Sequence, residues 1–269
     1  MNLEWSHVGL AFLLTLLAGL STGIGSAVAL LTKRTSKKFL SVSLGFSAGV
    51  MIYVSFVEIY PQAQTSLEAV YDSTWAALFV CIAFFAGMGV IALIDKLIPS
   101  YENPHELKSV ESMYNKEDHK LMRMGVLSAV AIFIHNFPEG LATFISGLGS
   151  ADIAYPIAFA IGLHNIPEGI AVSVPLFFAT GNKKKAFTWS FLSGLSEPVG
   201  GLMGFALLYF FVGINQAVLG FLFAFVSGIM VFISFDELLP TAKEYGAHHL
   251  AIYGLIAGMA VMALSLVIL

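Results

Sequence analysis

The chain has 269 residues, of which 58% are hydrophobic and only 11% are charged, and its mean hydropathy is +0.85. Soluble domains carry about 25% charged residues, so too little polar surface remains to wet a globule of this size. These figures exclude a soluble globular protein, a disordered chain and a nucleic-acid-binding protein, and they indicate a polytopic membrane protein. The net charge of −4 says little once the bilayer is the solvent. A single cysteine, Cys81, excludes an internal disulfide framework and a thiolate-cluster metal site.

Eight apolar stretches follow one another along the chain, each long enough to cross the hydrocarbon core as a helix of roughly 20 residues. They cover residues 8–31, 38–60, 73–98, 122–148, 154–180, 185–211, 215–240 and 248–269. Because the stretches are continuous rather than alternating, they predict an all-α fold and exclude a β-barrel. The whole chain, residues 1–269, then forms a single transmembrane domain. Its longest polar loop, at about 99–120, is interpreted as a solvated linker.

The basic residues predict the orientation of the chain in the membrane. All 13 Lys and Arg residues lie at or between the ends of alternate stretches, and the other set of loops has none. Cytoplasmic loops carry the excess of Lys and Arg in membrane proteins. We therefore expect both termini to be extracytoplasmic, in a multi-pass protein of a bacterial inner membrane.

Two of the predicted spans contain the same motif. GVMIYVSFVEIYPQA at 49–63 matches GIMVFISFDELLPTA at 228–242, and a weaker match relates GLSTGIGS at 19–26 to GLSEPVGG at 194–201. Spans 2 and 7 are five spans apart and must cross the membrane in opposite directions, as in the inverted repeats of secondary transporters. The repeats divide the chain into two units and a central pair of helices, at residues 1–98, 185–269 and 122–180.

A second, sharper repeat places acidic residues inside the membrane. HNFPEG at 135–140 recurs as HNIPEG at 164–169, on adjacent antiparallel spans. Acidic residues lie inside predicted spans at six positions: Glu58, Glu139, Glu168, Glu197, Asp236 and Glu237. A charge at the bilayer centre costs at least ~2.5–3.5 kcal/mol, so we expect these side chains to face the bundle interior. No Lys or Arg lies near the middle of any span, which leaves protons, water or a metal cation as partners.

Helical geometry favours a metal. At ~100° per residue, Glu139 lies between His135 and Asn136 on one helix. The second motif repeats this pattern with His164, Asn165 and Glu168. Two facing helices then outline two adjacent metal sites that are bridged by the two glutamates, and Glu197 on span 6 is placed to complete the second site.

The available ligands restrict the metal only partly. Imidazole, carboxylate and amide groups suit Zn²⁺, Fe²⁺, Mn²⁺, Co²⁺ or Cd²⁺ better than Cu⁺. For Glu58, Asp236 and Glu237, metal binding, proton binding, gating and hydrogen bonding between helices stay open as alternatives.

The two HNxPEG motifs, together with Ser196-Glu197-Pro198 and Glu237–Pro240, resemble the ZIP (Zrt-/Irt-like protein) family, and its bacterial zinc permeases most, over essentially the whole chain. The resemblance implies eight spans in a 3+2+3 arrangement, uptake of divalent metal into the cytoplasm as substrate without a prosthetic group, and a homodimer. It also implies that spans 1, 4, 5 and 6 move against a frame of spans 2, 3, 7 and 8. By position, it implies that Glu139, His164 and Glu168 hold zinc, with His135 close by. The residues of the neighbouring, iron-associated site would be Asn136, Glu139, Asn165, Glu168 and Glu197.

Two other functions compete with a carrier. A divalent-metal-selective channel would use the same ligands, and the sequence does not separate it from a carrier. A membrane-embedded metalloenzyme is disfavoured, because the chain lacks the H-E-x-x-H motif and a Ser or Cys nucleophile paired with a His. We therefore expect a transport protein and no enzyme.

Overall fold

The computed structural model describes residues 5–31, 37–97, 136–148, 151–245 and 248–268, which form helices joined by short turns. In chain order the elements are α1 (Trp5–Leu31), α2 (Lys37–Val54), the π-helical turn η1 (Ser55–Ile59), α3 (Tyr60–Glu68), α4 (Ser73–Leu97), a helix at 136–148, α7 (Ala151–Thr180), α8 (Lys183–Gly194), α9 (Ser196–Leu207), the π-helical turn η2 (Leu208–Val212), α10 (Gln216–Ile233), the π-helical turn η3 (Ser234–Leu238), α11 (Leu239–Tyr245) and α12 (His248–Ile268). These residues contain no strand, so the all-α prediction is confirmed for the described part of the chain.

Six helical segments of the described chain are long and apolar enough to cross a membrane. They are Trp5–Leu31, Lys38–Glu68, Ser73–Lys96, Lys183–Val212, Gln216–Glu244 and His249–Ile268, and they match six of the eight predicted spans. A seventh predicted span, 154–180, coincides with α7, whose 30 residues include the polar residues of the HNIPEG motif. Of the span predicted at 122–148, the described part is the helix at 136–148, and the loop predicted at 99–120 lies outside the described residues.

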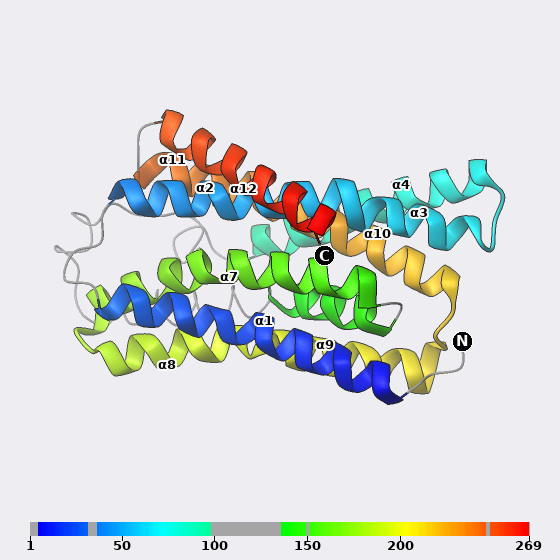
Figure 1. The fold of residues 1–269 in the computed structure, drawn as a ribbon, viewed down its shortest axis with the longest axis horizontal. Coiled ribbons are helices and arrows are strands. Elements are labelled where there is room, and N and C mark those ends of the chain that lie inside the picture. Colours follow the sequence, from blue (N-terminus) through cyan, green and yellow to red (C-terminus); the bar gives the residue numbers. More distant parts are fainter. Residues whose placement is uncertain (1–4, 32–36, 98–135, 149–150, 246–247, 269) are drawn as a thin grey trace.

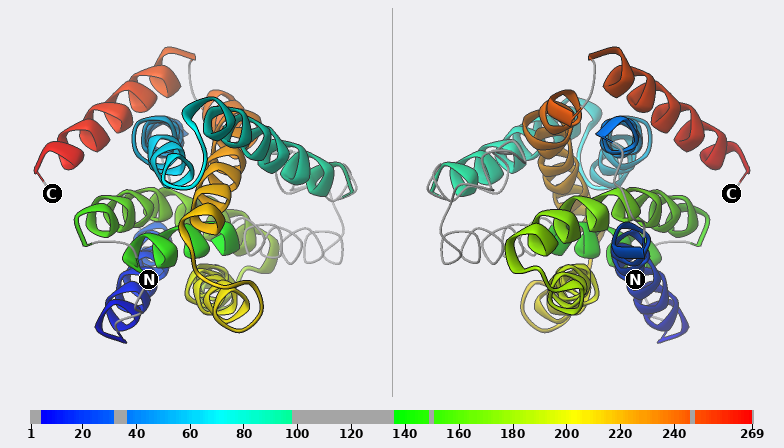
Figure 2. Two further views of the ribbon diagram at one scale, coloured as in Figure 1. Left: turned by 90° about the vertical axis from the view of Figure 1, so that its right-hand side faces the viewer. Right: turned by 90° about the vertical axis from the view of Figure 1, so that its left-hand side faces the viewer.

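The helices form two sets, which lie one above the other in Figure 1 and are seen from the two ends of the bundle in Figure 2. The metal-motif set contains α1, α7, α8, α9 and the helix at 136–148. The frame set contains α2, α3, α4, α10, α11 and α12. The most extensive contacts join α1 to α7, α2 to α12 and α4 to α10, each within one set. Among the labelled elements, the two sets meet chiefly where α2 packs against α7.

Close backbone contacts hold each set together. A Cβ atom on Gly25 would collide with the backbone of Ile166, so α1 and α7 approach more closely at this point than any larger residue allows. Other described glycines also face a backbone carbonyl oxygen of a neighbouring helix so closely that an added Cβ would collide with it. In every such case the neighbouring helix belongs to the same set. The contacts inside a set are therefore closer than those between the sets.

The inverted repeat is visible in the backbone. The π turns Ser55–Ile59 and Ser234–Leu238 occupy equivalent positions in the two copies of the motif, and a proline follows each turn. The helices continue beyond Pro61 and Pro240 as α3 and α11, so the predicted span ends at 60 and 240 were too early. The π turns explain the difference. Proline has no backbone N–H to donate, and the extra residue of a π turn accommodates this missing hydrogen bond, so the helix continues.

The described lysines at helix ends gather at one end of the bundle. The start of α2, the turn between α7 and α8 and the end of α11 lie at the left of Figure 1. Lys183, the first residue of α8, donates from Nζ to the carbonyl oxygen of Leu30 at 2.5 Å, so the end of α1 lies there too. The start of α1 and the turn between α3 and α4 lie at the other end. The lysines of α2, α8 and α11 that lie near these helix ends are thus found at one end of the bundle.

Candidate metal centre

The described polar residues of both HNxPEG motifs are buried inside the protein. The second copy is near the middle of α7, and the described part of the first copy begins the helix at 136–148. The side chains that carry ligand atoms are almost entirely inaccessible: Glu139 is 0% exposed, His164 is 1% exposed and Glu168 is 5% exposed. His164 and Glu168 are four residues apart and therefore share one face of α7.

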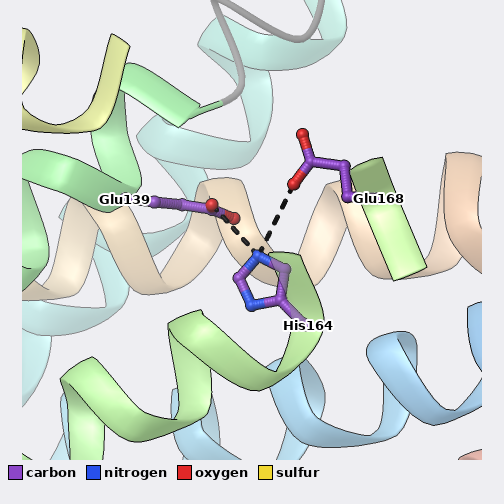
Figure 3. Close-up of side chains that lie close together, drawn as sticks. All are labelled: Glu139, His164 and Glu168. Atoms are coloured by element: carbon purple, nitrogen blue, oxygen red, sulfur yellow. Dashed lines mark hydrogen bonds and ion pairs between the residues drawn. The ribbon is translucent and has the colours of Figure 1, made fainter. Parts of the chain in front are cut away.

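Three ligand atoms converge on one point between these helices (Figure 3). Nε2 of His164 lies 3.1 Å from Oε2 of Glu139 and 4.0 Å from Oε2 of Glu168. One ligand atom from each of the three residues lies within 4.8 Å of the other two. Oxygen and nitrogen ligands of a tetrahedral zinc ion, bound at ~2.0–2.2 Å, lie roughly 3.4 Å apart. The spacing of the cluster therefore suits a single ion held by all three side chains.

Several polar atoms of the cluster lack a hydrogen-bond partner among the described residues. Both carboxylate oxygens of Glu168 and Nδ1 of His164 are buried and make no hydrogen bond within the described part of the chain. A buried carboxylate without hydrogen-bond donors is costly unless a cation or a proton compensates it. The arrangement is thus one that a divalent cation stabilises.

A second group of polar side chains lies beside the first. Nδ2 of Asn165 donates to Oε1 of Glu197 and, at 2.8 Å, to the carbonyl oxygen of Ala18. The structure thereby brings Glu197, in the first turn of α9, into contact with the motif of α7. Oε2 of Glu197, Oδ1 of Asn165 and both amide atoms of Asn136 are buried without a hydrogen-bond partner in the described residues.

The two halves of this region are related by the inverted repeat. Gly169 of α7 packs so closely against the backbone of Thr22 that an added Cβ would collide with it. The equivalent Gly140 packs in the same way against the backbone of Glu197. Thr22 on α1 therefore occupies the place that Glu197 occupies on α9. Sequence reasoning missed Thr22, although the weaker repeat at 19–26 and 194–201 aligns these two residues. The Oγ1 atom of Thr22 is buried and has no hydrogen-bond partner among the described residues.

The remaining predicted residues lie in different environments. His135 is outside the described residues. Glu58 and Glu237 are partly buried, and Glu237 lies close enough to Glu168 to interact with it electrostatically. Asp236 is exposed, so the expectation that all six acids face the interior is wrong for this residue. Consecutive residues of η3 point in different directions, so Glu237 can face the centre while Asp236 faces outward.

Comparisons with known proteins give matches over nearly the whole chain. Residues 3–95 and 98–266 match the family described as ZIP Zinc transporter. A Streptococcus mutans protein named Zinc transporter ZupT is 63% identical over 262 residues, which are 97% of this chain and 98% of that protein. A relative of the same name from Clostridium perfringens is 58% identical over 278 residues, covering 98% of this chain and 97% of the relative. Another, from Lysinibacillus sphaericus, is 57% identical over 268 residues and covers 98% of both chains.

Proposed function

The chain belongs to the ZIP family of zinc transporters, and on that premise we propose that it carries Zn²⁺ across the membrane into the cytoplasm. Its relatives are named as transporters and not as enzymes. The observation that carries the proposal is the buried Glu139–His164–Glu168 cluster. Such a cluster, inside a protein whose described helices include six candidate membrane spans, is suited to hold a cation during its passage.

Zinc is the substrate of this site, and three protein ligands leave a coordination position open. A structural zinc site is closed by four protein ligands, whereas an open position allows the ion to exchange. His135 belongs to the same motif and is proposed as a metal-binding residue close to this open position. An ion held by only a few ligands can be released after it has been bound.

A second ion is proposed to bind beside the first, between Asn136, Asn165 and Glu197, with Glu139 and Glu168 as bridging ligands. The buried oxygen atoms of Asn136, Asn165 and Glu197 that have no hydrogen-bond partner among the described residues support this site. Nitrogen and oxygen ligands discriminate poorly among first-row metals. We therefore include Fe²⁺, Mn²⁺ and Co²⁺, and also Cd²⁺, as candidate substrates.

Movement of the metal-motif set against the frame set is proposed to expose the centre to each side in turn. Close backbone contacts inside each set favour motion of each set as a unit. Glu58 and Glu237, with Asp236 beside it, occupy equivalent π turns of the frame set. Because the repeat is inverted, we place Glu58 on the outer path and Glu237 on the inner path, where they receive metal or protons.

The protein is proposed to sit in the bacterial inner membrane as a homodimer with eight spans in a 3+2+3 arrangement and both termini outside. The lysines at one end of the bundle support this orientation, because basic residues accumulate on the cytoplasmic side.

Uptake of radioactive zinc into liposomes that contain the purified protein tests the proposal. We expect saturable uptake by the native protein and its loss in Glu139→Gln and Glu168→Gln, which remove one charge each without a large change in volume. Glu68→Gln makes the same chemical change at an exposed residue outside the site, and it should leave uptake unchanged.

Uptake that survives both substitutions at matched protein content would show that the cluster is structural. Uptake that does not saturate with zinc concentration would point to a channel. No uptake of any divalent metal would overturn the transport proposal.

A further inference from the structure

An apolar cavity of about 410 Å³ lies between the two sets of helices, next to the metal motif. One wall is formed by α4 and another by α10, both from the frame set. The third wall comes from the helix at 136–148 of the metal-motif set. The lining residues are Val90, Ile91, Ile94, Phe137, Pro138, Leu141, Leu222, Phe225, Val226 and Ile229.

The cavity has a buried floor and an accessible rim. Ile91, Val226 and Ile229 are at most 6% exposed, whereas Val90 is 43% exposed. Leu222 and Leu141 have intermediate exposure. The cavity is therefore a pocket that opens on the surface of the described helices and not a sealed void.

Water is a poor occupant of this space. Every lining residue in the described part of the chain is apolar, and a water molecule in a cavity needs two to four polar partners. An empty apolar space of this size is also unfavourable, because its lining loses dispersion contacts. An apolar ligand satisfies both conditions.

The membrane itself supplies such a ligand. Two walls belong to α4 and α10, which are among the six candidate membrane spans, so an opening between these helices lies at the depth of the hydrocarbon chains. The volume of about 410 Å³ holds about fourteen groups of roughly 30 Å³ each, the space of one water molecule in the liquid, and lies within the usual range for small-molecule sites. This matches the bulk of one long alkyl chain.

We propose that the acyl chain of a membrane lipid binds in this cavity, between α4, α10 and the helix at 136–148. The bound chain contacts Phe137 and Pro138, which lie between the metal-motif residues Asn136 and Glu139. It also touches both sets of helices at once, so the site changes shape whenever one set moves against the other. The binding of the chain does not depend on whether zinc is transported.

Photolabelling of the purified full-length protein in liposomes tests the proposal. The probe is palmitic acid with a diazirine group in its chain, and insertion sites are mapped by mass spectrometry. We expect labelling of residues 90–94, 137–141 and 222–229 that saturates with probe concentration and is displaced by unlabelled palmitic acid. Labelling of the general lipid-facing surface should rise without saturation.

Two substitutions on opposite walls separate the cavity from the surrounding surface. Val90→Trp and Leu222→Trp fill the space and should each abolish the saturable labelling. Leu93→Trp is the matched control, because Leu93 is 57% exposed on the same helix and does not line the cavity, and it should retain saturable labelling. Thermal unfolding in detergent verifies that each variant is folded. Saturable labelling that persists in both folded cavity variants, or labelling that never saturates in the native protein, would overturn the proposal.

Discussion

Asn136 and Asn165 hold equivalent positions in the two motifs but differ in their bonding. The amide of Asn165 donates to Glu197 and to the carbonyl oxygen of Ala18. The amide of Asn136 makes no such bond, but it lies close enough to Glu168 of the cluster to interact with it. The same residue type therefore joins neighbouring helices in one motif and faces the cluster in the other.

This difference predicts that alanine lowers stability more at Asn165 than at Asn136. Asn165→Ala leaves Glu197 and Ala18 without a donor and should lower the free energy of unfolding by about 1–3 kcal/mol. Asn136→Ala breaks no described hydrogen bond, so it should change stability less while still weakening metal binding. Thermal unfolding in detergent and zinc titration of the same samples measure both effects. Equal losses of stability in the two variants would contradict a ligand role for Asn136.

Glu197 should affect metals unequally. It takes no part in the Glu139–His164–Glu168 cluster and instead lies with Asn165. Glu197→Gln should therefore lower Fe²⁺ uptake by about tenfold and Zn²⁺ uptake by less. Competition between the two metals in one uptake assay measures the ratio directly. A larger loss for zinc than for iron would reverse the assignment of the two sites.

At the scale of elements, helix crossings position the proposed ligands. The crossing of α1 and α7 occurs at Gly25 and Ile166, and Ile166 lies between Asn165 and Pro167 of the motif. A side chain at this crossing forces the two helices apart at the point where the ligands are held. The packing of small residues is thus coupled to the geometry of the metal centre.

Gly25→Ala should disturb the centre without touching a ligand. Its methyl group collides with the backbone of Ile166, and we expect a loss of about 1–3 kcal/mol of stability together with reduced zinc uptake. Gly9→Ala is the control on the same helix, since an added methyl there meets no atom within 4 Å. That variant should keep full uptake and should not lose stability. Normal uptake by Gly25→Ala would mean that the crossing tolerates separation.

The sequence predicted some elements well and others poorly, for identifiable reasons. Long apolar stretches and the repeated HNxPEG motif are local signals, so the sequence could indicate the helical spans and the three residues that form the buried cluster, Glu139, His164 and Glu168. The π turns could not, because Pro61 and Pro240 normally mark a helix end and only tertiary packing shows that the helices continue. Thr22 was missed because its position depends on a contact with Gly169 from another helix.

At the scale of the whole molecule, orientation in the membrane is open to a direct test. In a Cys81→Ser background, Val70→Cys places a thiol in the exposed turn between α3 and α4, and Lys184→Cys places one at the start of α8. The distribution of lysines predicts that an impermeant maleimide labels Val70→Cys in intact cells. Lys184→Cys should react only after the membrane is opened. The reverse pattern would invert the proposed topology.

Relative motion of the two sets gives a further prediction. Val90→Trp enlarges a frame residue at the cavity that separates the sets, so it should obstruct movement while leaving the metal ligands in place. We expect a lower maximal rate of zinc uptake with an unchanged dissociation constant for zinc. Leu93→Trp should match the native rate. A weakened zinc affinity with a normal rate would contradict a role of the cavity in motion.

The most direct measurement is zinc K-edge X-ray absorption on the purified protein loaded with Zn²⁺. The buried cluster predicts nitrogen and oxygen ligands only, at ~2.0–2.2 Å, with scattering from imidazole. It also predicts that zinc no longer binds with this signature in the Glu139→Gln/Glu168→Gln double variant. A sulfur ligand at ~2.3 Å, or an unchanged spectrum in the double variant, would show that zinc is held elsewhere.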